Sequence, residues 1–319
     1  MAAAPYQTLH AARLADETPP LSWMVEELFI EAGAGILGGA PKTGKSFLAL
    51  DLCVAVASGT SCASRFAVSR QGPVLLLCAE DPLALVSSRL HALARGRDLA
   101  LAHLPVEVIV DEAVRLPEGL ARLEATLERF HPRLLLLDPL IRLHRADENS
   151  ASEMSLILDG LRRLARVSRT AILLVHHARK AAAANAGTAL RGSSDLHAFG
   201  DSNLYLKRAA QSATLELKIE HRAAASPRPI CLKLLADDKT ARFVVSDHRD
   251  SDDPAAVRIL ELLGHAKAPL SSATLRQQLG LRNQTVAHAL KSLLDQGRIR
   301  RAGRDGWTIT INHSHSHPL

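Results

Sequence analysis

Short apolar runs alternate with amphipathic stretches along the first half of the chain. The apolar runs that predict strands are Gly35–Gly38, Val74–Cys78, Val106–Val110, Leu134–Asp138 and Ile172–His176. The stretches between them that predict helices are Ser46–Ala57, Leu83–Ala94, Leu116–Phe130 and Ala151–Ser168. Strands that are apolar throughout and separated by helices are typical of a parallel sheet covered on both faces. The pattern therefore predicts an α/β fold with a mostly parallel, twisted sheet.

The pattern changes after Asp201, where predicted strands follow one another without helices between them. These strands are expected at Asn203–Lys207, Thr214–Glu220, Ile230–Leu234 and Arg242–Val245. We expect them to extend the sheet in an antiparallel or mixed arrangement.

A polar segment, Asp247–Asp253, separates this region from a compact C-terminal pattern. Helices are expected at Pro254–Gly264, Ser271–Leu279 and Asn283–Gln296, and paired strands at Arg298–Arg301 and Trp307–Ile311. Three helices followed by a hairpin are the pattern of a winged helix-turn-helix domain. The predicted domains are an N-terminal arm at 1–20, an α/β domain at 21–246, a linker at 247–253, a small winged-helix domain at 254–312 and a flexible tail at 313–319.

The composition is that of a folded protein without a membrane span. Hydrophobic residues make up 47% of the 319 residues, and no apolar run approaches the roughly 18 residues that a spanning helix needs. The N-terminus lacks the apolar core of a secretory signal. The four cysteines form no CxxC pair, which favours buried thiols in a reducing cytoplasm over disulfides or a metal site. We therefore expect a cytoplasmic protein with no membrane partner.

The formal net charge of +6 is concentrated at one end of the chain. From Pro254 onward there are nine Lys and Arg residues and three acids, so the remainder of the chain is neutral. A local basic excess suggests a polyanion partner for the C-terminal domain.

A complete phosphate-binding loop follows the first predicted strand and opens the first predicted helix. Its residues are Gly39, Ala40, Pro41, Lys42, Thr43, Gly44, Lys45 and Ser46, and Phe47 comes directly after it. Glycines let backbone N–H groups face the phosphates, and the helix N-terminus adds the positive end of its dipole. Lys45 is expected to bridge the terminal phosphates of ATP, and the Ser46 hydroxyl to ligate Mg²⁺.

Three further strand ends carry polar residues suited to nucleotide hydrolysis. Asp138 ends an apolar strand and is expected to hold Mg²⁺. Glu80 ends another and is the candidate for orienting the attacking water, whereas its neighbour Asp81 is expected to cap the next helix. Either His176 or His177 can sense the γ-phosphate at the end of a third strand, and we favour His177.

Taken in this order, the motifs resemble the RecA-like ATPase superfamily and, within it, the RepA-type plasmid hexameric replicative helicases. The segments that carry the resemblance are Pro20–Trp23, Gly39–Ser46, Leu77–Pro82, Leu135–Asp138, Val175–Lys180 and Arg191–Ser194. The resemblance covers about residues 20–245 of the chain. It implies that Glu80 is the catalytic carboxylate and that His177 is the switch residue.

Members of that family work as rings with ATP between the subunits, so the resemblance implies a homo-oligomer, by analogy a hexamer. An arginine from the neighbouring subunit stabilises charge in the transition state of these proteins. The candidate here is Arg222, with Lys218 and Arg208 as fallbacks.

The resemblance also implies that the loop after the sensor strand binds single-stranded DNA in a central channel. Lys180 and Arg191 are the candidate phosphate contacts in this loop, and Arg142–Asn149 is a candidate second channel loop. An ordinary surface loop is the alternative interpretation of the first of these segments.

A winged helix places its third helix in the major groove of duplex DNA and its wing near the backbone. Candidates for base contacts near the start of that helix are Arg282, Asn283, Gln284, Thr285 and His288. Candidates for phosphate contacts from the wing are Arg298, Arg300, Arg301 and Arg304. Many winged helices bind protein instead, and that alternative stays open.

The leading hypothesis is an oligomeric, Mg²⁺-dependent ATPase that moves on or remodels DNA. The alternatives are a non-translocating, ATP-gated regulator or mobile-element accessory protein, a recombinase-like filament ATPase, and a nucleotide-binding scaffold without turnover. Against the scaffold stand four intact site residues, which are Lys45, Ser46, Glu80 and Asp138.

Overall fold

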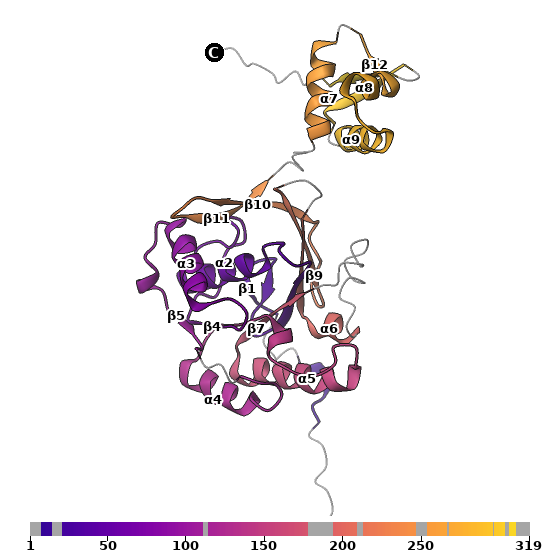
Figure 1. Cartoon of the computed structure of the whole chain (residues 1–319). Coiled ribbons are helices and arrows are strands. Elements are labelled where there is room, and N and C mark those ends of the chain that lie inside the picture. The colour runs from indigo at the N-terminus through magenta and orange to yellow at the C-terminus, as the bar shows by residue number, and fades with distance from the viewer. Residues whose placement is uncertain are drawn as a thin grey trace, which may run out of the picture. The chain divides into compact units, whose positions relative to one another are not determined.

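A computed structural model describes residues 8–14, 21–110, 114–177, 194–208, 213–246, 254–266, 268–295, 297–303 and 306–310 of the chain. The chain forms two compact units (Figure 1). The larger holds Met1–Leu206, Lys218–Arg228 and Leu235–Phe243, and the smaller holds Lys207–Leu217, Pro229–Leu234 and Val244–Leu319. The expected linker and tail, and most of the expected N-terminal arm, lie outside the described residues. The expected domain boundaries remain a prediction.

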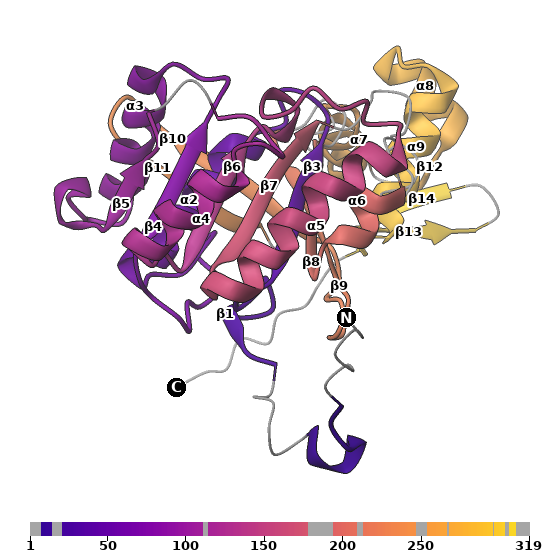
Figure 2. The ribbon, with the colours of Figure 1, turned by 90° about the horizontal axis from the view of Figure 1, so that it is seen from below.

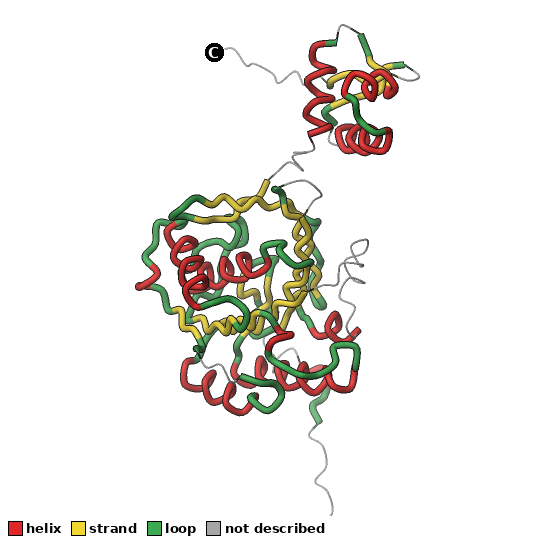
Figure 3. Tube along the Cα trace, viewed as in Figure 1, coloured by secondary structure: helices red, strands yellow, loops and turns green. Residues whose placement is uncertain are grey.

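A nine-stranded sheet is the centre of the α/β fold, and Figure 3 shows its strands in yellow. Its order is β11-β10-β9-β8-β3-β7-β6-β4-β5. The strands are β3 (Ala34–Gly39), β4 (Val74–Cys78), β5 (Val106–Val108), β6 (Leu134–Asp138), β7 (Ala171–His177), β8 (Ser202–Arg208), β9 (Leu215–His221), β10 (Ile230–Ala236) and β11 (Ala241–Ser246). The strand pairings from β8 through β3, β7, β6 and β4 to β5 are parallel, and β9 pairs with β10 antiparallel. The expectation of a mostly parallel sheet is confirmed.

Helices cover the sheet on both faces, with α4 and α5 on one and α2 on the other (Figures 1 and 2). The helices of this region are α2 (Lys45–Ser58), α3 (Leu83–Arg95), α4 (Leu120–Phe130), α5 (Ala151–Ser168) and α6 (Ser194–Phe199). Three short 3₁₀ turns are η1 (Ala11–Arg13), η2 (Leu101–His103) and η3 (Leu140–Arg142). No helix among the described residues is both long and apolar enough to cross a membrane.

The spacing of apolar residues explains why α5 lies on the sheet. Its buried side chains are Met154, Ile157, Leu158, Leu161, Leu164 and Ala165, which recur every three or four residues. They pack on strand residues such as Ile172 and Leu174 of β7, which are fully buried. Burying each large aliphatic side chain stabilises the fold by roughly 1.5–3 kcal/mol. This packing fixes the strands whose ends form the functional site.

The largest difference from the expected bounds is at the start of α4, and several other elements differ by one or two residues. The helix expected from Leu116 begins at Leu120, because Leu116 is extended and its N–H donates to the carbonyl of Leu143. Pro117 also disfavours a helical backbone at the residue before it. The strand expected to reach Val110 ends at Val108. A hairpin of β1 (Trp23–Val25) and β2 (Phe29–Ile30) was not expected, because runs this short have no measurable period.

The C-terminal part of the smaller unit contains three helices and a three-stranded sheet. The elements are α7 (Pro254–His265), β12 (Leu270–Ser271), α8 (Ser272–Leu279), α9 (Asn283–Asp295), β13 (Ile299–Ala302) and β14 (Gly306–Ile309). The helices and the hairpin lie within two residues of their expected bounds, and β12 was not expected. Trp307 is 7% exposed and donates from Nε1 to the hydroxyl of Ser272 at 3.0 Å, which ties the sheet to α8. This region therefore has a hydrophobic core of its own.

Candidate nucleotide-binding site

The phosphate-binding loop connects the end of β3 to the start of α2. Gly44 precedes α2 with φ of 91°, a backbone conformation that side chains rarely adopt. A Cβ atom at Gly39 would lie 2.3 Å from the carbonyl oxygen of Leu206 in β8, so only glycine fits there. The Thr43 hydroxyl donates to the carbonyl of Ala40 at 2.9 Å, while Pro41 is exposed. These contacts hold the loop at the carboxyl edge of the sheet, where ligands bind in such folds.

A cavity of about 240 Å³ opens beside this loop. Residues expected from the sequence that line it are Lys42, Gly44, Lys45, Ser46, Phe47, Glu80, Asp138 and His177. Cys78, Asp81 and Arg89 line it as well. The lining therefore combines the phosphate-binding loop and the start of α2 with the ends of β4, β6 and β7 and with one residue of α3.

Lys45 is almost completely buried at the base of this cavity. It is 3% exposed, and its Nζ donates to the carbonyl of Ala40 at 2.8 Å. Burial lowers the pKa of Lys45 to about 8, while the nearby carboxylates of Asp138 and Glu80 act in the opposite direction. A phosphate would supply the negative charge that this partly desolvated ammonium group lacks.

Asp138 and Ser46 supply oxygen atoms to the lining of the same cavity. Burial raises the pKa of Asp138 to about 6, and a hydrogen bond with Ser46 lowers it. Hard cations such as Mg²⁺ take oxygen ligands and are usually held by one or two protein groups together with phosphates and water. This donor pair fits Mg²⁺. The described residues contain no cluster of three or more His, Cys, Asp or Glu side chains able to hold a metal ion by themselves.

Glu80 and His177 contact each other in the lining of the cavity. Glu80 Oε2 lies 3.4 Å from His177 Nε2, and 48% of the Glu80 side chain is exposed. Burial lowers the pKa of His177, the charge of Lys45 lowers it further, and the contact with Glu80 raises it. Adjacent residues of a strand point to opposite faces, so His176 points away from the cavity. Of the two histidines, the structure brings His177 to the cavity.

Asp81 does not cap the next helix, so that expectation is wrong. Pro82 precedes α3, and no side chain caps the first turn of this helix. Asp81 instead accepts a hydrogen bond from Arg89 of α3. The guanidinium group of Arg89 lies 5.5 Å from the ring centroid of Phe47, and the edge of that ring meets Phe243. No sequence motif marks Arg89, whose place in the cavity depends on how α3 packs.

The AAA domain family matches residues 2–183, which include the loop, Glu80, Asp138 and His177. The chain belongs to the AAA domain family. Among solved structures it is similar to one titled "The Structure Of A DnaB-Like Replicative Helicase And Its Interactions With Primase", with 15% identity and a TM-score of 0.53. The similarity covers 66% of this chain and 57% of that one, so this chain spans a little over half of the helicase chain. At this identity the match shows a shared fold.

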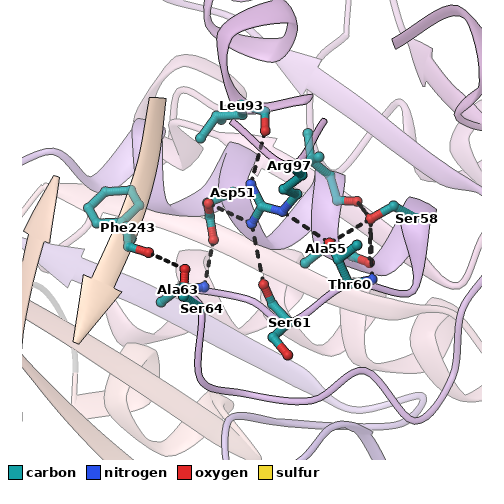
Figure 4. Close-up of polar contacts among 11 residues, drawn as sticks. Asp51, Ala55, Ser58, Thr60, Ser61, Ala63, Ser64, Leu93, Arg97 and Phe243 are labelled. Atoms are coloured by element: carbon teal, nitrogen blue, oxygen red, sulfur yellow. Dashed lines mark hydrogen bonds and ion pairs between the residues drawn. The ribbon is translucent and has the colours of Figure 1, made fainter. Parts of the chain in front are cut away.

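A buried ion pair anchors α2 in this AAA domain (Figure 4). Asp51 of α2 is fully buried and lies 2.7 Å from the Nη2 atom of Arg97, which follows α3. The second carboxylate oxygen of Asp51 accepts from the backbone N–H of Ala63 at 2.8 Å. The hydroxyl of Ser64 donates to the carbonyl of Phe243 in β11 at 2.7 Å. This network connects the helix that carries Lys45 to α3, to the loop after α2 and to β11.

Arg222, the expected catalytic arginine, is not among the residues that line the cavity of the AAA domain. It lies just beyond β9, donates to the carbonyl of Ala198 and approaches Asp201 at 4.0 Å. Lys218, one of the fallbacks, lies 2.6 Å from Glu220. Arg208, the other, is exposed at the end of β8.

Most of the expected C-terminal DNA contacts are exposed. Arg282, Asn283, Gln284, His288, Arg298, Arg300 and Arg301 are exposed, and Thr285 is half-buried. The guanidinium group of Arg301 lies 5.0 Å from the ring centroid of Trp307. Lys180, Arg191 and Arg304 lie outside the described residues.

Proposed function

We propose that this chain is a Mg²⁺-dependent ATPase that acts on DNA as an oligomer, with a helicase-like motor of the RepA type and a C-terminal winged helix that targets DNA. The observation that carries the proposal is the convergence of Lys45, Glu80 and Asp138 on one cavity beside an intact phosphate-binding loop. Phosphoryl transfer needs little more from a protein than positioning and charge stabilisation, and these residue types supply both.

The loop residues bind the phosphates in this proposal. Backbone N–H groups of the loop and the N-terminus of α2 face them, and Lys45 exchanges its bond to the Ala40 carbonyl for a bond to phosphate oxygen. Ser46 and Asp138 hold Mg²⁺, which neutralises charge on the phosphates when it is bound. The half-buried ring of Phe47 and the guanidinium group of Arg89 both line the cavity, and we assign them to contact the nucleobase by stacking.

Glu80 orients the attacking water. Its half-exposed carboxylate can reach solvent and cavity alike, and its contact with His177 fixes its direction. His177 in turn is placed to detect the γ-phosphate, because it lines the cavity together with Lys45.

Arg222 acts in the cavity of a neighbouring subunit of a homo-oligomer, by family resemblance a hexameric ring. Its position in its own chain, bonded to Ala198, supports a role outside its own cavity. Subunits that carry Arg222→Ala and subunits that carry Lys45→Ala can be mixed to test this. If Arg222 acts in trans, some mixed interfaces contain neither lesion and regain activity, whereas mixtures without any gain contradict the assignment.

DNA binding is proposed at two places. Lys180 and Arg191 contact single-stranded DNA in a central channel, and α9 with the β13–β14 hairpin contacts duplex DNA. The exposed face of α9 includes Asn283, Gln284 and His288, which suit base edges, and the exposed Arg300 suits a phosphate. The independent core of this region also favours a second candidate function, an ATP-gated regulator that reads duplex DNA without moving along it.

ATP hydrolysis with Mg²⁺, measured alone and with single-stranded or duplex DNA, tests the proposal. Lys45→Ala controls for contaminating ATPases. Stimulation by single strands would support the motor, and unwinding of a forked duplex would follow as the next assay. If Lys45-dependent hydrolysis is unchanged by single-stranded and duplex DNA, the motor is contradicted and the regulator is favoured. If no Lys45-dependent hydrolysis is detected, both are contradicted.

A further inference from the structure

A second cluster of titratable side chains lies at the end of β7, behind the proposed γ-phosphate sensor. It consists of His144, Glu148 and His176, which we call the histidine–glutamate cluster. Glu148 Oε1 lies 3.5 Å from His176 Nδ1 and 3.9 Å from His144 Nε2. His176 is 4% exposed, and the side chain of His144 is fully buried. The proposed ATPase chemistry uses none of these three side chains.

His176 and His177 are neighbours on β7 but belong to different environments. His177 contacts Glu80 in the nucleotide cavity, and His176 contacts Glu148 on the other face of the sheet. These two residues pair with Gly38 and Gly39 of β3, where the phosphate-binding loop begins. A shift of the His177 backbone toward a bound phosphate would therefore move His176 as well.

Glu148 belongs to the segment Leu140–Asn149, which follows Asp138 and precedes α5. The N–H of Leu143 donates to the carbonyl of Leu140 at 2.9 Å, and the N–H of Asp147 donates to the carboxylate of Glu153 in α5 at 3.0 Å. These bonds tie parts of the segment to each other and to α5. We expect a displacement of Glu148 to be passed along it. Its outward side chains include Arg142 and Arg145, which are exposed.

The contact between the strand and the segment is incomplete in this structure. His176 Nδ1 is buried without a hydrogen-bond partner, and the 3.5 Å to Glu148 is too long for a good hydrogen bond. Burial lowers the pKa of His176 to about 4, so the ring is neutral at pH 7 and can donate from Nδ1. A small shift of the strand end would complete a hydrogen bond to a carboxylate, which is stronger than one between neutral groups. The completed hydrogen bond would be a second arrangement of lower energy, and a switch requires two such arrangements.

We propose that the contact between Glu148 and His176 couples the occupancy of the γ-phosphate site to the position of Leu140–Asn149. Glu148 is then a positioning residue. Through it, nucleotide binding changes the position of the exposed cations of this segment. The inference rests on the proposed nucleotide binding at Lys45 and His177, but it adds a specific path from that site to another surface.

Amide hydrogen exchange on the full chain tests this path, with no nucleotide, with Mg²⁺–ADP, and with Mg²⁺ and a non-hydrolysable ATP analogue. Both nucleotides should slow exchange at Gly39–Ser46. Only the triphosphate should change exchange at Leu140–Asn149. A wild-type chain without protection at Gly39–Ser46 would overturn the proposed nucleotide site and this inference together. Protection there with no triphosphate-specific change at Leu140–Asn149 would overturn this inference alone.

Variants then isolate the contact. Glu148→Met keeps the length of the side chain and removes its oxygens, so it should keep protection at Gly39–Ser46 and lose the triphosphate-specific change. Glu148→Gln keeps an acceptor oxygen and should retain part of the change, which a merely structural role would not predict. Glu128→Met, at an exposed carboxylate on α4, is the matched control and should behave as wild type.

A second variant covers the case in which Glu148→Met does not fold. His176→Leu removes the other partner of the contact and lies outside the proposed nucleotide machinery, so it should also lose the change at Leu140–Asn149 while Gly39–Ser46 stays protected. A full triphosphate-specific change in either Glu148→Met or His176→Leu would overturn the proposed path.

Discussion

Arg97 and Asp51 form an ion pair inside the fold, at 2.7 Å, with 10% and 0% of their side chains exposed. Arg97 also donates to the carbonyl of Leu93 at 3.1 Å and to the hydroxyl of Thr60 at 3.0 Å, so its guanidinium group is well satisfied. Removing one partner of such a pair leaves a buried charge without compensation.

Arg97→Met should therefore destabilise the protein by about 3–5 kcal/mol. The free energy of unfolding from urea titration measures this directly. The double variant Arg97→Met with Asp51→Leu should lose less than the sum of the two single changes, because it removes both charges. A strictly additive double variant would show that the pair is not coupled as described.

Glu80→Gln should keep nucleotide affinity and reduce ATP turnover by about 10²–10⁴-fold, the range typical for loss of a general base. The side chain keeps its size and its distance to His177 but can no longer accept a proton. Binding of a fluorescent ATP analogue and steady-state hydrolysis measure the two effects separately. Asp81→Asn, at the neighbouring carboxylate that pairs with Arg89, should retain most turnover. If both variants lost ATP turnover to a comparable extent, the assignment of Glu80 as the residue that activates water would be contradicted.

Acid should destabilise the protein partly through His176. Burial lowers the pKa of His176 to about 4 in the folded chain, compared with about 6.5 in an unfolded one. As pH falls from about 6.5 to 4, the unfolded state takes up a proton that the folded state does not, so stability decreases by roughly 3 kcal/mol. Urea unfolding at several pH values should show a smaller loss for His176→Asn. His91→Asn, at an exposed histidine on α3, should follow the wild-type curve.

Arg300→Gln should weaken DNA binding similarly for all sequences, because phosphate contacts carry no sequence information. The slope of log K against log salt concentration should fall by about 0.9 for the loss of one phosphate contact. Fluorescence anisotropy over a series of salt concentrations measures this slope. Arg242→Gln, at an exposed arginine on β11, is the matched control, and an equal effect there would contradict a specific wing contact.

The sequence predicted the apolar strands and the residues at their ends well. A short run of four leucines that ends in a carboxylate, such as Leu134–Asp138, is typical of a buried strand. In the structure every residue of this strand is buried, and Asp138 is its last residue. The order of the central strands brings Glu80, Asp138 and His177 to one edge, and the phosphate-binding loop predicted that edge in advance.

Features that depend on packing between distant segments could not be predicted. Asp51 and Arg97 are 46 residues apart. From the sequence alone, Asp51 would be assigned to a solvent-exposed helix face and Arg97 to an exposed turn. Arg89 reaches the cavity because α3 packs beside α2, and Asp81 pairs with it instead of capping the helix. The choice between His176 and His177 needed the register of β7 against β3, which a sequence pattern does not contain.

β3 and β8 lie so close together that glycine is required for packing at some positions of β3. A motif search would attribute the glycine at position 39 to phosphate binding alone. A Cβ atom at Gly35 would lie 2.0 Å from the carbonyl oxygen of Ser202, much as one at Gly39 would meet that of Leu206. A mutational screen scored only for folded protein should therefore reject substitutions at Gly35 and Gly39 and accept many at the exposed Pro41. Glycine at position 39, although it opens the phosphate motif, would be required even in a descendant that had lost every affinity for nucleotide.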